Sequence, residues 1–89
     1  MSRTQQSVVN PAEVERLTVE WAAEILEEQV APEDNFLDLG GHSLLALELC
    51  QRVKDAFGMD LDVQVLFEKS VRETVAAAVD AIDPNTQNG

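Results

Sequence analysis

The sequence predicts an all-α protein, a small antiparallel helical bundle of three main helices and one short helix. Three segments repeat apolar residues at helical spacing, and only one short stretch has any strand character, so no sheet can form. The length of 89 residues allows one domain with a single modest core. We expect this domain at residues 10–82, with a flexible N-terminal segment at 1–9 and a flexible C-terminal tail at 83–89.

The first helix is predicted for the stretch "NPAEVERLTVEWAAEILEE", residues 10–28. Asn10 is suited to cap it, Pro11 fits the first helical position, and Glu13 completes a capping box. The residues expected to face the core are Val14, Leu17, Trp21 and Ile25, which recur at helical spacing.

A long connection at residues 29–42 precedes the second helix. It mixes turn-forming residues with Phe36, Leu37 and Leu39, and we expect these three apolar residues to pin the connection onto the helices. The second helix is predicted from Ser43 to Phe57, because Gly58 offers the left-handed C-terminal cap that ends a helix.

The stretch "VQVLF", residues 63–67, fits either a brief strand or a helical turn, and we predict a short helix because no partner strand exists. The last helix is predicted to begin at Ser70, which forms a second capping box with Glu73. Its apolar face comprises Val71, Val75, Ala78, Val79 and Ile82.

The composition restricts the partners. The chain has 17 acidic and 6 basic residues and a net charge of −11, so we expect no binding to nucleic acid or to an anionic membrane, and partners with basic surfaces. Cys50 is the only cysteine, which excludes an internal disulfide and a cysteine-based zinc cluster and is typical of a cytoplasmic protein. Met1 resembles a native start and favours a free-standing protein.

The second helix has apolar residues on two faces. Its core face is predicted to hold Ala46, Leu49, Cys50, Val53 and Phe57. Leu44 projects about 160° and Leu47 about 100° from the centre of that face. These two leucines therefore form either a docking patch beside Ser43 or a contact with the long connection.

Ser43 itself allows two interpretations. It is either the N-cap of the second helix or an accessible hydroxyl with a function. Gly40 and Gly41 remove side chains from the approach to the hydroxyl and permit sharp backbone geometry. A phosphate on Ser43 would meet the positive end of the helix, which stabilises an anion by about 0.3–1 kcal/mol.

Catalysis by the chain alone is not supported. The nucleophile pattern G-x-S-x-G lacks its second glycine, and His42 is too close in sequence to act as an oriented base for Ser43. No lysine follows the glycines as in a phosphate-binding loop, and the acidic segment from Asp34 lacks the glycine of a calcium loop. We expect no metal site and interpret His42 as a solvated loop residue.

The stretch "DNFLDLGGHSLLALELCQRV", residues 34–53, resembles the attachment motif of peptidyl carrier proteins of nonribosomal peptide synthesis. The resemblance extends less specifically from the first helix to about Ile82, and makes residues 10–82 a carrier domain. It implies that Ser43, flanked by Gly40, Gly41 and His42, accepts 4'-phosphopantetheine from coenzyme A through a magnesium-dependent phosphopantetheinyl transferase.

The same resemblance implies the role of the modified protein. The terminal thiol holds an aminoacyl or peptidyl group as a thioester, an adenylating enzyme loads it, and condensing or tailoring enzymes receive it, while the chain itself catalyses nothing. A partner face is implied at Leu44, Leu47, Leu66 and Phe67, of which Leu66 and Phe67 have a core position as the alternative.

Two alternatives to a peptidyl carrier stay open. His42 before Ser43 favours a peptidyl carrier, whereas the strong acidity is more typical of acyl carriers of polyketide or fatty-acid pathways and of free-standing carriers. The second alternative is an unmodified helical interaction module in which Ser43 only caps its helix. We expect a monomer, because no long apolar stripe is left after the core is assigned.

Overall fold

The computed structural model describes residues 10–82 and confirms the all-α class. The four helices are α1 (Pro11–Leu26), α2 (Ser43–Phe57), α3 (Val63–Glu68) and α4 (Val71–Ile82). The segments 1–9 and 83–89, which we expected to be flexible, lie outside the described residues. The ambiguous stretch at 63–67 is helical, as predicted.

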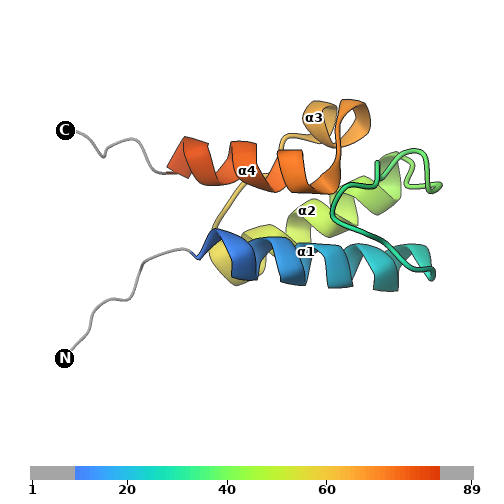
Figure 1. Ribbon diagram of the computed structural model, residues 1–89, viewed down its shortest axis with the longest axis horizontal. Coiled ribbons are helices and arrows are strands. Elements are labelled where there is room, and N and C mark those ends of the chain that lie inside the picture. The colour runs from blue at the N-terminus through green and yellow to red at the C-terminus, as the bar shows by residue number, and fades with distance from the viewer. Residues whose placement is uncertain (1–9, 83–89) are drawn as a thin grey trace.

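The bundle is built around α1, which packs against both α2 and α4 (Figure 1). Both α2 and α4 run in the opposite direction to α1, so the predicted antiparallel arrangement is confirmed (Figure 1). The short α3 packs against α2 and α4 and closes the remaining side. None of the helices within residues 10–82 has the length and apolar character needed to cross a bilayer.

Local capping explains where most helices begin and end. The Asn10 side chain accepts hydrogen bonds from the amides of Ala12 and Glu13, and Ser70 and Glu73 form the predicted reciprocal capping box of α4. Glu13 differs from the prediction, because its carboxylate pairs with Arg16 at 2.8 Å. Gly58 ends α2 with a φ of 70°, as expected for a left-handed cap.

The buried face of α1 differs from the predicted core face, because after Val14 the buried positions lie one residue later in the sequence. Val14 is fully buried as expected, but the other buried positions of α1 are Thr18 and Ala22. Leu17, Trp21 and Ile25 are only partly buried. Helix α1 contacts two helices at once, so small side chains occupy the centre of its inner face and larger ones flank it.

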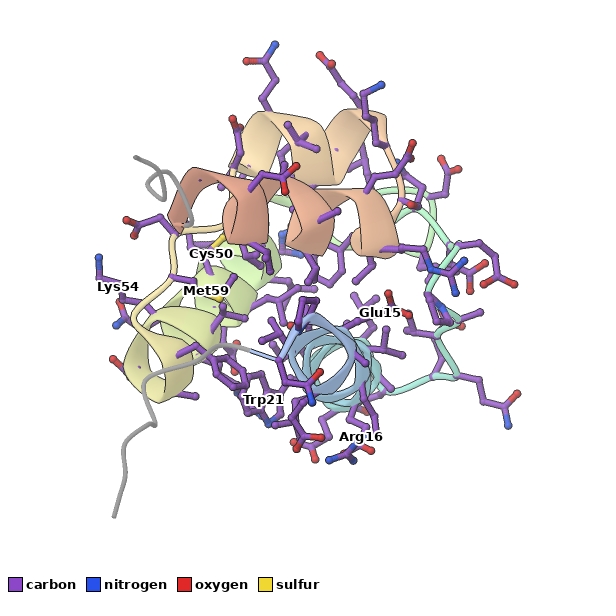
Figure 2. The ribbon with its side chains drawn as sticks, turned by 60° about the vertical axis from the view of Figure 1, so that its left-hand side comes forward. Glu15, Arg16, Trp21, Cys50, Lys54 and Met59 are labelled. Atoms are coloured by element: carbon purple, nitrogen blue, oxygen red, sulfur yellow. The ribbon has the colours of Figure 1, made fainter. Side chains whose placement is uncertain are left out.

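Trp21 illustrates this flanking position. Figure 2 shows Trp21 reaching from α1 towards α2 and Arg16 pointing away from the bundle. The ring centroids of Trp21 and Phe57 lie 6.0 Å apart with the rings tilted by 45°, a favourable aromatic geometry. The two rings therefore cover the edge of the α1–α2 interface.

One aromatic side chain of the connection between α1 and α2 enters the core. Phe36 is fully buried in the core, whereas Leu39 is partly buried and Leu37 is 46% exposed. The expectation that all three residues pin the connection is thus wrong for Leu37. The end of the connection, residues 36–42, leads directly into α2.

Candidate functional site

The chain enters α2 through a tight turn. The amides of Gly40 and Gly41 donate to the carbonyl oxygens of Leu37 and Phe36, both at 3.0 Å, and His42 N–H donates to Gly40 O at 2.9 Å. Gly40 has a φ of 96°, a backbone conformation that favours glycine. The predicted sharp backbone geometry is therefore present at Gly40.

Gly41 is needed for packing, which differs from the expected role of keeping the hydroxyl accessible. Gly41 is buried, and a Cβ at this position would lie 2.7 Å from Phe36 O and closer still to the Phe36 ring. The missing side chain thus allows the core aromatic residue to lie directly under the turn. By contrast, a Cβ on Gly40 would meet open space.

Ser43 is exposed and is the first residue of α2. The N-cap position belongs to His42, whose side chain makes no capping hydrogen bond. The interpretation of Ser43 as a helix N-cap is therefore wrong. The Ser43 hydroxyl stands at the accessible start of a helix without serving to close it.

The start of α2 is open to an anion. The first helical bond runs from Ala46 N–H to His42 O at 2.9 Å, so the amides of Ser43, Leu44 and Leu45 have no acceptor within residues 10–82. The other three described helices are closed by a side chain, from Asn10, Asp62 and Ser70 respectively. The first turn of α2 also contains no acidic residue. Free amides and the positive helix end together suit a phosphate group.

Apolar surface is concentrated around this helix start. Within residues 10–81 the exposed large apolar side chains are Leu37, Leu44 and Leu47, at 46%, 74% and 57% exposure. All three lie between six residues before and four residues after Ser43. The exposed positions of Leu44 and Leu47 match the prediction from helix geometry that both residues point away from the core face of α2. Leu37 was missed because periodicity does not show which of two consecutive loop residues points inward.

The implied partner-face residues on α3 do not share this exposure. Leu66 is fully buried in the core, so the implied partner role of Leu66 is wrong and its alternative core position is correct. Phe67 is partly buried and packs against the core cluster. Because α3 packs on both α2 and α4, at least one of its apolar residues is enclosed between them, and this residue is Leu66.

The remaining reactive side chains do not form a second centre. No group of three or more His, Cys, Asp or Glu side chains in the described part of the chain is arranged to hold a metal ion. Cys50 is half-buried beside the chain after α2, with its Sγ 3.9 Å from Leu61 O. Burial, together with the negative charges of Asp60 and Asp62, raises the pKa of the Cys50 thiol.

Helix α2 thus begins at an exposed serine with free amides, and exposed leucines lie close to this serine in the sequence. The family model that describes a phosphopantetheine attachment site matches residues 15–86. The chain therefore belongs to the phosphopantetheine attachment-site family. Proteins of this family carry a covalently attached 4'-phosphopantetheine, and the open start of α2 fits its phosphate.

The chain is similar to segments of much longer proteins. It is 47% identical over 62 residues to a linear gramicidin synthase of Brevibacillus parabrevis, covering 65% of this chain and 1% of that protein. It is 44% identical over 69 residues to phosphinothricin tripeptide synthetase PhsB of Streptomyces viridochromogenes, covering 78% of this chain and 6% of that protein. The chain thus spans only a small fraction of the length of the curated relatives it matches.

Proposed function

We propose that this protein is a peptidyl carrier that holds an aminoacyl or peptidyl intermediate as a thioester on a 4'-phosphopantetheine arm attached to Ser43. The observation that carries the proposal is the exposed Ser43 hydroxyl at the only described helix start without a side-chain cap. The similarity to enzymes named as gramicidin and phosphinothricin tripeptide synthetases supports a peptidyl rather than an acyl cargo.

The attachment chemistry assigns a simple role to this chain. The Ser43 Oγ forms a bond to the phosphorus that carries the pantetheine group in coenzyme A, the bond to the nucleotide breaks, and the hydroxyl proton leaves to a base. A phosphopantetheinyl transferase supplies that base and its magnesium ion. After transfer, the free amides at the start of α2 and its positive end stabilise the phosphodiester by about 0.3–1 kcal/mol.

The protein is proposed to act without catalysis of its own. His42 is exposed and is the immediate neighbour of Ser43, and no hydrogen bond from another side chain within residues 10–82 orients its ring. An adenylating enzyme loads the arm, and condensing or tailoring enzymes receive its cargo. Because coenzyme A donates the arm, we expect this cycle in the cytoplasm, with the carrier as a monomer.

Partner enzymes are proposed to dock on the exposed leucines. Leu37, Leu44 and Leu47 supply the apolar centre, and exposed Asp38 and Glu48 lie next to them in sequence. Four basic side chains already pair with carboxylates of this chain, namely Arg16, Arg52, Lys54 and Arg72. Because these basic side chains are already paired, they do not neutralise further acidic side chains. The net charge of −11 therefore favours a partner with a basic rim.

The attachment is tested by intact mass measurement. The purified protein is incubated with coenzyme A and a broad-specificity phosphopantetheinyl transferase, next to a Ser43→Ala variant and a Ser70→Ala variant. We expect the protein and Ser70→Ala to gain the mass of one phosphopantetheine and Ser43→Ala to gain none. If the unsubstituted protein keeps its mass after incubation with several competent transferases, the alternative of a helical interaction module is favoured instead.

An acyl carrier is the second candidate, because the net charge of −11 is typical of acyl carriers. The two candidates differ in the group that is loaded. Incubating the modified protein with adenylating enzymes and amino acids, or with acyl-activating enzymes and fatty acids, identifies the cargo by mass. Loading by acyl groups alone would overturn the peptidyl role while leaving Ser43 as the attachment residue.

A further inference from the structure

The side-chain amide of Asn35 joins the loop before Ser43 to the end of α3. Its Nδ2 donates to Phe67 O at 3.0 Å and to Lys69 O at 2.8 Å, which lie 32 and 34 residues away in the sequence. Its Oδ1 accepts a hydrogen bond from Asp38 N–H at 2.8 Å. One side chain thus connects the turn that leads to Ser43 with a distant element.

Along this loop, Asn35 is also the residue nearest to Ser43 that forms hydrogen bonds to an element of the described structure other than α2. The backbone links from this loop to α4 are earlier in the chain, with Val71 N–H donating to Asp34 O and Arg72 N–H to Pro32 O. After Asn35, the amides of residues 39–42 all donate to carbonyl oxygens of the loop itself. Within the described residues, Asn35 therefore provides the final hydrogen-bonded link between this loop and another helix, next to the buried ring of Phe36.

We infer that Asn35 is a positioning residue that holds the loop of residues 36–42 against the end of α3, so that partner enzymes meet Ser43 and Leu37 in one arrangement. The inference rests on the proposed function, because it assigns Asn35 a role in recognition of the Ser43 site. Asn35 itself touches no reacting atom and acts through the loop backbone.

The expected kinetic effect follows from population shift. Without the two bonds to α3, the loop occupies several arrangements, and only a fraction of the molecules present Ser43 correctly. An enzyme that binds only this fraction shows a KM for the carrier raised by the inverse of the fraction, with an unchanged kcat at saturation. The loss of two net hydrogen bonds shifts the equilibrium between correct and other loop arrangements by about 5- to 150-fold, and KM rises about tenfold when this shift leaves the correct arrangement in about one tenth of the molecules.

The test compares two variants of Asn35. Asn35→Asp keeps an oxygen for Asp38 N–H but places a carboxylate oxygen against the carbonyl oxygens of Phe67 and Lys69, so it breaks only the link to α3. Asn35→Ala removes all three bonds. The matched control is Asn10→Ala, which removes a side chain that accepts hydrogen bonds from two amides at the start of α1. The start of α1 lies at the end of the bundle opposite to the loop (Figure 1).

Two measurements are made on each folded variant, well below its thermal midpoint. The rate of amide hydrogen exchange at residues 39–42 is measured before phosphopantetheine is attached, so this measurement needs no enzyme. Initial rates of phosphopantetheine transfer give KM and kcat separately. Asn35→Ser, which is too short to reach both carbonyl oxygens, replaces Asn35→Asp if that variant does not fold.

We expect both Asn35 variants to exchange residues 39–42 faster and to raise KM about tenfold with kcat changed less than about twofold, while Asn10→Ala changes neither. Unchanged exchange or an unchanged KM in Asn35→Asp would overturn the positioning role, even if Asn35→Ala is impaired. If the unsubstituted protein gains no phosphopantetheine, the proposed function fails, and exchange alone decides whether Asn35 holds the loop.

Discussion

Replacing Thr18 by valine is expected to stabilise the domain. Thr18 is fully buried on the inner face of α1, and its hydroxyl has no hydrogen-bond partner among the residues that the structure describes. A hydroxyl removed from water without a new partner costs about 1–3 kcal/mol in proteins. Valine replaces the hydroxyl by a methyl group of similar shape, so no cavity is created.

The magnitude follows from two contributions. The unpaired hydroxyl is removed, and one additional methyl group is buried, which alone is worth about 0.8 kcal/mol. Threonine and valine have similar helix propensities, so the backbone contributes little difference. Part of this gain is lost where the new methyl group packs less well than the oxygen it replaces. We expect a net gain in the free energy of unfolding of about 1–2 kcal/mol.

Thr74 provides a matched control in α4. It is also fully buried, but its Oγ1 donates to Ser70 O at 2.8 Å. Ser70 O retains the helical bond from Thr74 N–H at 3.0 Å after the hydroxyl is removed. Thr74→Val therefore loses one satisfied hydrogen bond, worth about 0.5–1.5 kcal/mol, and gains one buried methyl group. We expect its stability to change by less than about 1 kcal/mol.

Urea unfolding of the three proteins tests this difference. A gain in Thr18→Val is read as a higher midpoint at an unchanged slope, and the thermal midpoint should rise by about 4–8 °C per kcal/mol for a domain of this size. The reasoning is refuted if Thr18→Val lowers the free energy of unfolding. It is also refuted if Thr18→Val and Thr74→Val shift the midpoint equally, because the unpaired hydroxyl would then carry no cost.

Three further predictions concern the site and one helix cap. Hydrogen bonds from the Ser70 amide and hydroxyl lower the pKa of Glu73 below its ordinary value, so its contribution to stability is complete above the unfolded-state pKa and is lost as the pH falls through the lower folded-state pKa. Urea midpoints of Glu73→Gln should therefore fall less on acidification than those of the unsubstituted protein, and an equal fall would contradict this linkage. Leu44→Ser should change the free energy of unfolding by less than about 0.5 kcal/mol, because Leu44 is 74% exposed, but should lower kcat/KM for phosphopantetheine transfer. An unchanged kcat/KM would remove Leu44 from the docking surface. His42→Ser supplies the missing cap of α2 and should raise the free energy of unfolding of the unmodified protein by about 1 kcal/mol, a gain that a lower urea midpoint would disprove.

Most helix boundaries were predictable because they depend on neighbouring residues, whereas α1 ends at Leu26, two residues before its predicted end, with Glu27 as a left-handed C-cap. Asn10, Gly58 and the Ser70–Glu73 pair act within one turn of the helix ends that they define, and each acts there in the structure. The two faces of α2 were predictable for a similar reason, since Leu44 and Leu47 diverge from the core stripe by helix geometry alone.

Other features depend on distant neighbours and were not predictable from one sequence. The buried position of Thr18 follows from the packing of α1 between two helices, and the buried position of Gly41 follows from the Phe36 ring beneath it. The three hydrogen bonds of Asn35 likewise require the end of α3 to lie beside the loop. Spacing along the chain carries no signal for such contacts.

The start of α2 departs from two local rules at the same place. A helix normally receives a side-chain cap, and large apolar residues normally turn inward, yet His42 leaves the amides of α2 uncapped and Leu44 is exposed directly beside them. The other described helices of the same chain follow the capping rule, so the departure is not a general weakness of the sequence. Local rules are most often broken where function requires it. An uncapped helix start reduces the stability of the free domain, and an exposed leucine leaves apolar surface in water. Both become favourable when a phosphate binds the amides and a partner covers the leucine. The stability lost at this one helix start is thus consistent with a surface that is completed by the attached arm and by the enzymes that act on it.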